Sequence, residues 1–217
     1  MTPRRSLLAA PLLLAPLAAR AQEEYPSRPV NVVVPWPPCG PTDAFARLFA
    51  QRLSTDLGRP FVVDNRAGAG GTIGMAQAQR LRADGTNLVI TPNSTYAVAQ
   101  HLYPIQYDAE RSFVGVGLLV SSPLFIMVRG NSPHRTLQSF LEAARRPNAR
   151  VTYANSGVGS TSHLAMEMMM QMAGVTIEEV GYRGGGPAIQ AMLAGETDIF
   201  CLPAAAAMPR WPRYRDR

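Results

Sequence analysis

The stretch VVVPWPPCGPTD, residues 32–43, joins an apolar run to a helix start through a proline-rich loop. Residues 30–34 contain three successive valines, a pattern typical of a strand that is covered on both faces. Thr42 and Asp43 are residue types that begin helices. The loop is therefore expected at the carboxyl end of a strand, where open α/β sheets bind ligands and free N–H groups of the next helix can hold an anion. An ordinary strand-to-helix connection stiffened by proline would give the same pattern.

A second loop of this kind, ANSGVGSTSH, covers residues 154–163. It follows a strand predicted at residues 151–154 and precedes a predicted helix. Its glycines allow close approach to the backbone, and its hydroxyls supply neutral donors. Thr161 or Ser162 is also expected to cap the helix, which is compatible with ligand binding. Two facing loops of this type would hold one small anion.

Apolar strands alternate with helical patterns along the whole chain, which predicts parallel strands with crossover helices, an α/β fold. We expect two α/β lobes, the first over residues 22–120 and the second over residues 121–200. Two apolar runs, residues 114–120 and 124–128, are expected to form a strand pair that crosses between the lobes. The predicted strands are residues 30–34, 61–63, 88–91, 151–154, 177–180 and 198–201, and the predicted helices are residues 43–57, 72–82, 96–103, 137–144, 163–173 and 187–193.

Composition and termini limit the function classes. Residues 1–21 have the pattern of a signal peptide, with Arg4 and Arg5 before an apolar run and Ala19-Arg20-Ala21 as the cleavage site, so we predict an exported, periplasmic protein. No later apolar run is long enough to cross a membrane. The net charge of +6 is carried entirely by arginine, without a basic stripe interleaved with aromatics, which argues against nucleic-acid binding. The two cysteines exclude a disulfide-dense scaffold, and their spacing does not decide whether they pair.

Enzymatic and cofactor readings find little support in the motifs. His163 has no histidine, cysteine or carboxylate at the spacing of a triad or metal site, and a single histidine at a first helical turn is usually structural. The sequence GVGST lacks the second glycine of a nucleophile elbow. The glycine-rich residues 68–74 follow a strand, but Ile73 stands where a dinucleotide fingerprint needs its third glycine. Residues 182–187, YRGGGP, also follow a strand and place Pro187 at a helix start. We predict no catalytic residue, no metal and no cofactor.

Four ordered segments, YPSRPVNVVVPWPPCGPTDAFARLFAQRL, DNRAGAGGTIG, YANSGVGSTSHLAMEMM and VGYRGGGPAIQAMLAGETDIF, resemble the Bug or TctC family of extracytoplasmic solute receptors. The resemblance implies a two-lobed Venus-flytrap architecture, type II-like, that closes as a monomer on a small carboxylate and presents it to the membrane permease of a tripartite tricarboxylate transporter. It implies that two loops hold the carboxylate through amides, hydroxyls and waters. The residues so implicated are Pro37, Pro38, Cys39, Gly40, Thr42 and Asp43 in the first loop and Ser156, Gly159, Ser160, Thr161, Ser162 and His163 in the second.

The chain departs from this family at two places. Cys39 stands where members usually have glycine, and a left-handed position would tolerate cysteine poorly. After Phe200 the family pattern gives way to Cys201-Leu202-Pro203 and an arginine-rich tail, residues 201–217, so we expect a C-terminally truncated receptor with an incomplete second lobe, low stability and weak binding. An exported α/β enzyme and a nonfunctional fragment of the receptor are the alternatives.

Overall fold

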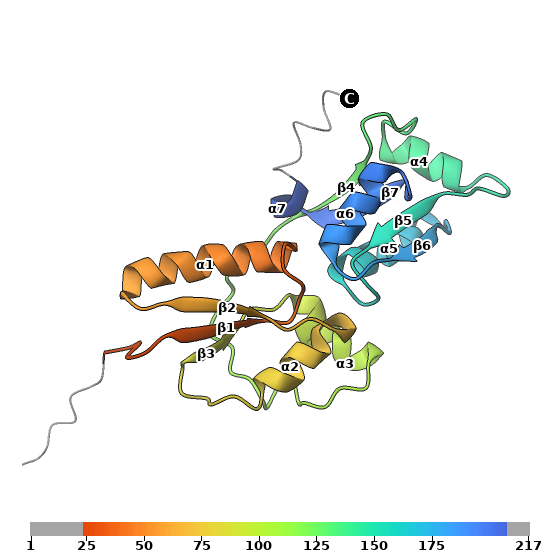
Figure 1. The fold of residues 1–217 in the computed structure, drawn as a ribbon. Coiled ribbons are helices and arrows are strands. Elements are labelled where there is room, and N and C mark those ends of the chain that lie inside the picture. Colours follow the sequence, from red (N-terminus) through yellow and green to blue (C-terminus); the bar gives the residue numbers. More distant parts are fainter. Residues whose placement is uncertain (1–23, 208–217) are drawn as a thin grey trace, which may run out of the picture.

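The computed structural model describes residues 24–207, which form two α/β lobes, each built on its own sheet (Figure 1). The predicted signal peptide, residues 1–21, and the last ten residues of the predicted tail lie outside the described residues. Among the described residues, no helix is both long enough and apolar enough to cross a membrane.

The first lobe contains a parallel sheet in the order β2-β1-β3. The chain runs from β1 (Val30–Val34) through α1 (Pro41–Leu57) to β2 (Phe61–Asn65), then through a 3₁₀ turn (Ala69–Gly71) and α2 (Thr72–Ala78) to β3 (Asn87–Val89). Because β2 and β3 lie on opposite sides of β1, the winding reverses at β1, which makes its carboxyl end the switch point of this sheet. A π-helical turn (Ser94–Val98) and α3 (Ala99–Leu102) follow β3.

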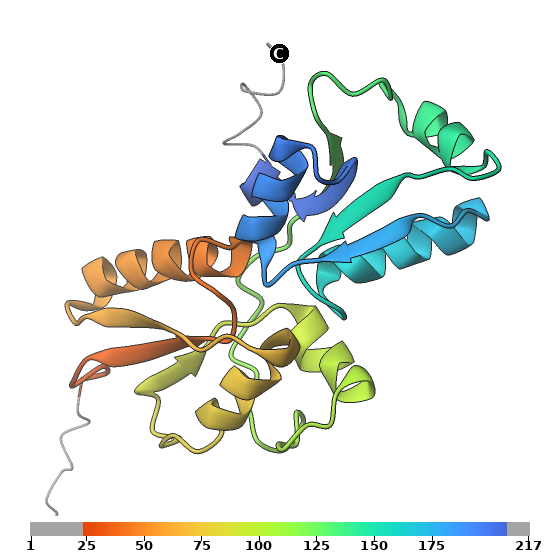
Figure 2. The ribbon, with the colours of Figure 1, turned by 45° about the vertical axis from the view of Figure 1, so that its right-hand side comes forward.

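The second lobe repeats this winding. The chain runs from β5 (Thr152–Asn155) through α5 (Thr161–Ala173) to β6 (Glu178–Gly181), and through α6 (Gly185–Ala194) to β7 (Ile199–Pro203), with the strand order β4-β7-β5-β6. Only β4 (Leu124–Val128) is antiparallel, to β7. The carboxyl end of β5 is the switch point here, and helix α4 (Leu137–Ala144) and the short α7 (Ala204–Ala207) complete the lobe. Figure 2 shows the same arrangement of both lobes turned by 45°.

Alternating strand residues build a core on each face of the second sheet. Tyr153 and Ile199 pack with Met166 and Phe140 on one face, whereas Ala154, Phe200 and other buried residues pack against α6 on the opposite face. Both faces are covered, as parallel strands require. In the first lobe, Val30, Val32 and Phe61 pack beneath Ala50 of α1, and Met75 of α2 packs with Tyr107 and Ala109 in a separate cluster.

The main helices and parallel strands confirm the predicted alternation, with small differences at their ends. Helix α1 begins at Pro41 and ends before Gly58, which has the expected left-handed conformation (φ 63°). Helix α2 ends at Ala78 instead of residue 82. The predicted helix at residues 96–103 starts earlier, as the π-helical turn from Ser94.

The predicted strand pair at residues 114–128 is wrong in its first half. Residues 124–128 form β4, which pairs with β7, but residues 113–123 form no strand. Val114 and Val116 are 90% exposed and Leu118 is 86% exposed. An apolar run becomes a strand only where another strand pairs with it, and no described strand lies beside this segment.

The predicted boundary between the second lobe and the tail falls inside β7. Cys201 and Leu202 are buried in that strand and contribute to its two core clusters. The boundaries predicted for the two lobes at residues 22–120 and 121–200 remain predictions, although β4, the first strand of the second sheet, begins at Leu124.

Candidate functional site

The first predicted loop joins β1 to α1 at the switch point of the first sheet. Gly40 is the N-cap residue of α1 and Pro41 occupies the first turn, where a missing N–H costs nothing. Pro37 is half-buried, whereas Pro38 and Cys39 are exposed. Cys39 has φ 63°, the left-handed conformation that the sequence suggested for this position.

Asp43 holds this loop from below instead of facing outward. The residue is 3% exposed, and its Oδ2 accepts hydrogen bonds from the Cys39 amide and from Arg47 Nε, each at 2.9 Å. Its Oδ1 accepts from Asn65 Nδ2 at 3.0 Å, and the same amide nitrogen donates to the Trp36 carbonyl. Burial alone would raise the pKa of Asp43, but the bonds from Arg47, Cys39 and Asn65 outweigh it and lower the pKa below 3.8. The carboxylate is therefore satisfied within the protein.

The second predicted loop joins β5 to α5 and is organised by its own side chains. Ser160 caps α5, and its Oγ accepts from the His163 amide at 3.3 Å. The Ser156 amide donates to Ser162 Oγ at 3.1 Å, and Ser162 Oγ lies 3.0 Å from Ser160 Oγ. Ser160 and Ser162 are buried, so these hydroxyls line the floor of the loop. The predicted capping role falls to Ser160, one residue before Thr161.

Several backbone N–H groups in the two loops have no acceptor in the described part of the chain. They are the amides that begin the two helices together with those of adjacent loop residues. Cys39 is excluded from this set because Asp43 binds its amide, and Pro37 and Pro38 have no N–H. The unpaired amides are those of Gly40, Thr42, Asp43, Val158, Thr161 and Ser162.

The two loops face each other across the interface between the lobes, where the first turn of α1 approaches α6 (Figure 2). A Cβ atom placed on Gly184 would lie 3.1 Å from Pro37 Cγ, and one on Gly185 would lie 3.2 Å from Pro41 Cδ. Only glycine allows this approach without displacement of the proline rings. The contact joins the first loop to the β6–α6 connection, which the sequence singled out as YRGGGP.

Residues after β3 close the other side of the interface. Tyr103 Oη donates to the Val158 carbonyl at 2.7 Å, and Thr161 Oγ1 donates to Ser94 Oγ at 3.2 Å. A Cβ atom on Gly159 would lie only 2.6 Å from Leu102 Cδ1. The lobes thus meet through residues of both loops.

Sequence reasoning missed Ser94, Leu102 and Tyr103. A signal was present, because the polar residues 91–95, TPNST, follow a strand in the same way as the two predicted loops. Trp36 was also missed, although its Nε1 donates to Thr95 Oγ1 at 2.8 Å. That bond fixes the first loop against the segment after β3.

His163 lies beneath the second loop and not on its outer surface. The Gly159 amide donates to His163 Nδ1 at 3.3 Å, and His163 Nε2 faces the carboxylates of Glu167 and Glu179 at 3.9 and 3.6 Å. Among the described His, Cys, Asp and Glu residues, these three form a group whose side-chain ligand atoms lie close enough together to hold one metal ion. The sequence did not show it, because Glu179 comes from the next strand.

The glycine-rich residues 68–74 serve packing. A Cβ on Gly74 would lie 2.3 Å from the Arg66 carbonyl oxygen and 2.7 Å from Pro35, and one on Gly71 would lie 2.6 Å from Thr95. These contacts account for the glycines without a dinucleotide. Cys39 is exposed and Cys201 is buried, both as free thiols, and burial raises the pKa of Cys201 to about 11.

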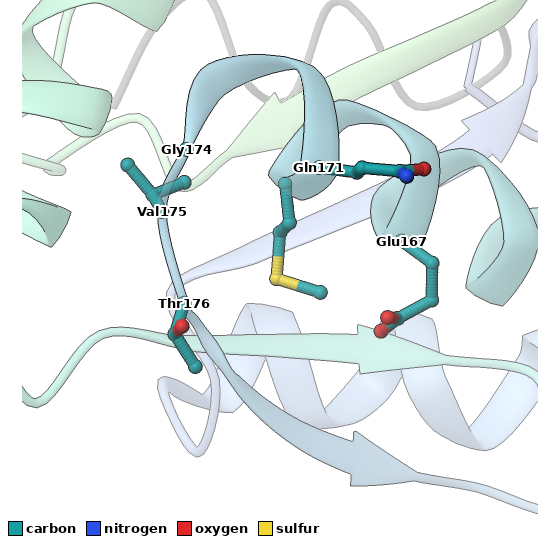
Figure 3. A pocket seen from close by; sticks show the side chains of 6 residues that line it. Glu167, Gln171, Gly174, Val175 and Thr176 are labelled. Atoms are coloured by element: carbon teal, nitrogen blue, oxygen red, sulfur yellow. The ribbon is translucent and has the colours of Figure 1, made fainter.

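A surface cavity of about 400 Å³ lies beside the C-terminal half of α5, at the opposite end of that helix from the second loop (Figure 3). Glu167 and Gln171 of α5 border it on one side, and Val175 and Thr176 of the following connection border it on the other. None of the predicted ligand-binding residues lines it. We therefore keep the candidate site at the two facing loops.

Two lobes of identical winding, with loops that meet from both switch points, define the class of two-lobed solute-binding proteins. Residues 45–214 match the family described as tripartite tricarboxylate transporter family receptor, TctC, and the chain belongs to this family. The match includes the residues at which the sequence suggested that the family pattern ends. This is a family of receptors, which agrees with the prediction of a binding protein and not an enzyme.

Individual relatives support the assignment. A protein from the tcbD-tcbE intergenic region of Pseudomonas sp. strain P51 is 37% identical over 201 residues, which cover 91% of this chain and 59% of the relative. The periplasmic binding protein BugD is 34% identical with a TM-score of 0.79, over 88% of this chain and 64% of that one. A Rhodopseudomonas palustris protein solved with adipate is 32% identical with a TM-score of 0.82, over 87% and 64%. The chain thus spans about three fifths of the length of its curated relatives.

Proposed function

We propose that this chain is a periplasmic receptor that captures a small carboxylate-bearing metabolite between its two loops and presents it to the membrane permease of a tripartite tricarboxylate-type transporter. The observation that carries the proposal is the set of unpaired amides at the starts of α1 and α5, two helix starts that lie at the contact between the lobes. Helix N-termini favour anions through the helix dipole and their free N–H groups. The adipate bound to the R. palustris relative is a ligand of this class.

Of the predicted ligand-binding residues, Gly40, Thr42, Thr161 and Ser162 have free amides that suit this role. Asp43 contributes its amide while its side chain holds the loop. Pro37 shapes the interface, and Ser156 and Ser160 hold the second loop. The function needs no cofactor, and we assign it to a monomer because one chain supplies both loops.

Thr161 tests the proposal directly, because two substitutions at this residue distinguish its backbone N–H donor from its hydroxyl donor. Ser160 has φ −67° and ψ 159°, a conformation that a following proline accepts, and Thr161 is the first residue of α5. Thr161→Pro removes the amide N–H and the hydroxyl, whereas Thr161→Val removes only the hydroxyl. We expect Thr161→Pro to weaken dicarboxylate binding about tenfold and Thr161→Val to weaken it less.

Isothermal titration calorimetry with adipate, malate and their neutral diamides measures these affinities on the mature chain. Binding of an acid but not of its diamide supports carboxylate recognition. If no carboxylate in a broad mono- and dicarboxylate panel binds, or if diamides bind equally well, the proposal is wrong. Equal losses of affinity in the two Thr161 variants would show that the hydroxyl, and not the amide, binds the carboxylate.

A further inference from the structure

The imidazole of His163 connects the second loop to a pair of acidic side chains. Its side chain is 14% exposed. The Gly159 amide donates to Nδ1 on one side of the ring, and Nε2 faces Glu179 Oε2 and Glu167 Oε1 on the other. The two nitrogens therefore meet opposite kinds of partner, a donor and an acceptor.

These contacts decide which ring nitrogen of His163 carries the proton. Because Nδ1 accepts the Gly159 N–H, it must hold a lone pair, and the neutral ring carries its proton on Nε2. An Nε2–H group facing two carboxylates is favourable. A proton on Nδ1 would set two donors against each other and release the Gly159 amide.

The same argument decides against a metal ion. The ligand atoms of His163, Glu167 and Glu179 lie within 4.8 Å of one another, which is close enough to surround a cation. A metal on Nε2 requires the lone pair there and the proton on Nδ1, where a metal-bound histidine normally donates to an acceptor. Here Nδ1 meets the Gly159 N–H, so the surroundings fit a proton on Nε2.

The carboxylates are themselves held in place. Tyr153 Oη donates to Glu167 Oε1 at 2.6 Å, and burial together with this bond raises the pKa of Tyr153, which keeps it a donor. Asn155 Nδ2 donates to Glu179 Oε1 at 2.7 Å, while Asn155 Oδ1 accepts the Gly157 amide at 2.7 Å. The network thus restrains two amides of the turn, those of Gly157 and Gly159.

We propose that His163 is a positioning residue for ligand capture: in its Nε2–H form it anchors Gly159 and so fixes the turn that presents the free amides of Val158, Thr161 and Ser162. The proposal rests on the proposed function for its effect on affinity. It assigns His163 an indirect role, in contrast to the direct contact expected from the sequence. Glu179 supports the same turn twice, through His163 and through Asn155.

Two variants of His163, to asparagine and to glutamine, place a side-chain amide at the position of one ring nitrogen or the other. In His163→Asn the side-chain oxygen can take the place of Nδ1 and accept the Gly159 N–H, whereas in His163→Gln the amide reaches the place of Nε2 and leaves Gly159 without an acceptor. We expect His163→Gln to lower the affinity for a dicarboxylate about tenfold, which is the effect of losing one hydrogen bond. His163→Asn keeps that bond and should lower the affinity no more than about threefold. Glu179→Gln should also weaken binding, while Glu178→Gln on the same strand should not.

Two measurements without ligand, on the native chain and on the His163 variants, test the proposal independently of binding. Nitrogen-15 NMR of labelled histidine should show the Nε2–H tautomer for His163, and the Gly159 amide should exchange with solvent more slowly in the native chain and in His163→Asn than in His163→Gln. These results support the positioning role even if no carboxylate binds, in which case the proposed function alone fails.

Three outcomes would overturn the proposal. One is an Nδ1–H tautomer. Another is equal loss of Gly159 protection or of affinity in both His163 variants, with thermal unfolding showing that both are folded. The third is a stoichiometric shift of the His163 resonances on addition of Zn²⁺ that strengthens carboxylate binding, which would make the cluster a metal site.

Discussion

Replacement of Cys39 with glycine should stabilise the protein. Cys39 has φ 63° in the loop before α1, and its side chain is exposed, so it contributes no core packing. A left-handed conformation costs a residue with a Cβ atom about 1–2 kcal/mol, and glycine avoids this cost. Glycine also has more conformational freedom in the unfolded chain, and this opposes the stabilisation by about 0.5–1 kcal/mol. Subtracting the middle of one range from the middle of the other leaves a net stabilisation of about 0.75 kcal/mol.

Cys39→Ala is the matched control, because it removes the thiol but keeps the Cβ atom. The amide of residue 39 still donates to Asp43 in either variant, so the loop keeps its anchor. We expect the alanine variant to match the native chain, while the glycine variant gains about 1–4 °C in melting temperature for a chain of this size.

Chemical denaturation at several urea concentrations, read by circular dichroism, measures the free energies of unfolding. The midpoint should move in Cys39→Gly without a change in slope. The reasoning is refuted if Cys39→Ala is stabilised as much as Cys39→Gly, since the gain would then come from loss of the thiol, or if the glycine variant shows no gain.

Three further changes test other contacts. Asp43→Ala should cost about 1–3 kcal/mol of unfolding free energy by urea denaturation, because it removes the acceptor of three partly buried hydrogen bonds. The pKa of Asp43 is lowered in the folded chain, so its contribution to stability is present above its unfolded value of 3.8 and is lost as pH falls through the folded pKa. Gly185→Val should weaken carboxylate binding by calorimetry and enlarge the molecule in small-angle scattering, because a Cβ there meets Pro41, whereas Gly186→Val has open space and should change neither. Tyr103→Phe removes a bond between the lobes and should lower affinity about threefold to tenfold, without loss of stability within either lobe. An unchanged affinity would show that this contact between the lobes does not support binding.

The sequence predicted the parts of the fold that depend on short-range patterns. The valines of β1, the left-handed Gly58 and the alternating strands and helices are local signals, and the structure has them at nearly the expected positions. The strand predicted at residues 114–120 is wrong for the opposite reason. Strand formation there depends on a pairing partner elsewhere in the chain, which an apolar run does not encode.

The positions of the two loops were easier to predict than the contacts of their side chains. Both loops were found at their predicted positions, because each follows a strand and precedes a helix. The role of Asp43 was not, because its partners Asn65 and Arg47 become visible only when β2 packs beside β1. The contact of His163 with Glu179 was not visible in the sequence for the same reason, since Glu179 reaches it from the neighbouring strand, and the direct contact of His163 with a ligand stays a prediction.

The repeated winding explains why two loops, distant in sequence, act on one interface. Each lobe reverses its strand order at the strand that precedes a loop, so each lobe presents its helix-start amides at its own switch point. One lobe alone offers an anion only part of this set. In the proposed function, a carboxylate would gain donors from both α1 and α5 only where Gly184 and Gly185 let the prolines of the first loop approach, so binding would depend on the contacts that join the lobes. We therefore expect affinity to depend on these two glycines as well as on the donors, and that dependence links the fold to the proposed function.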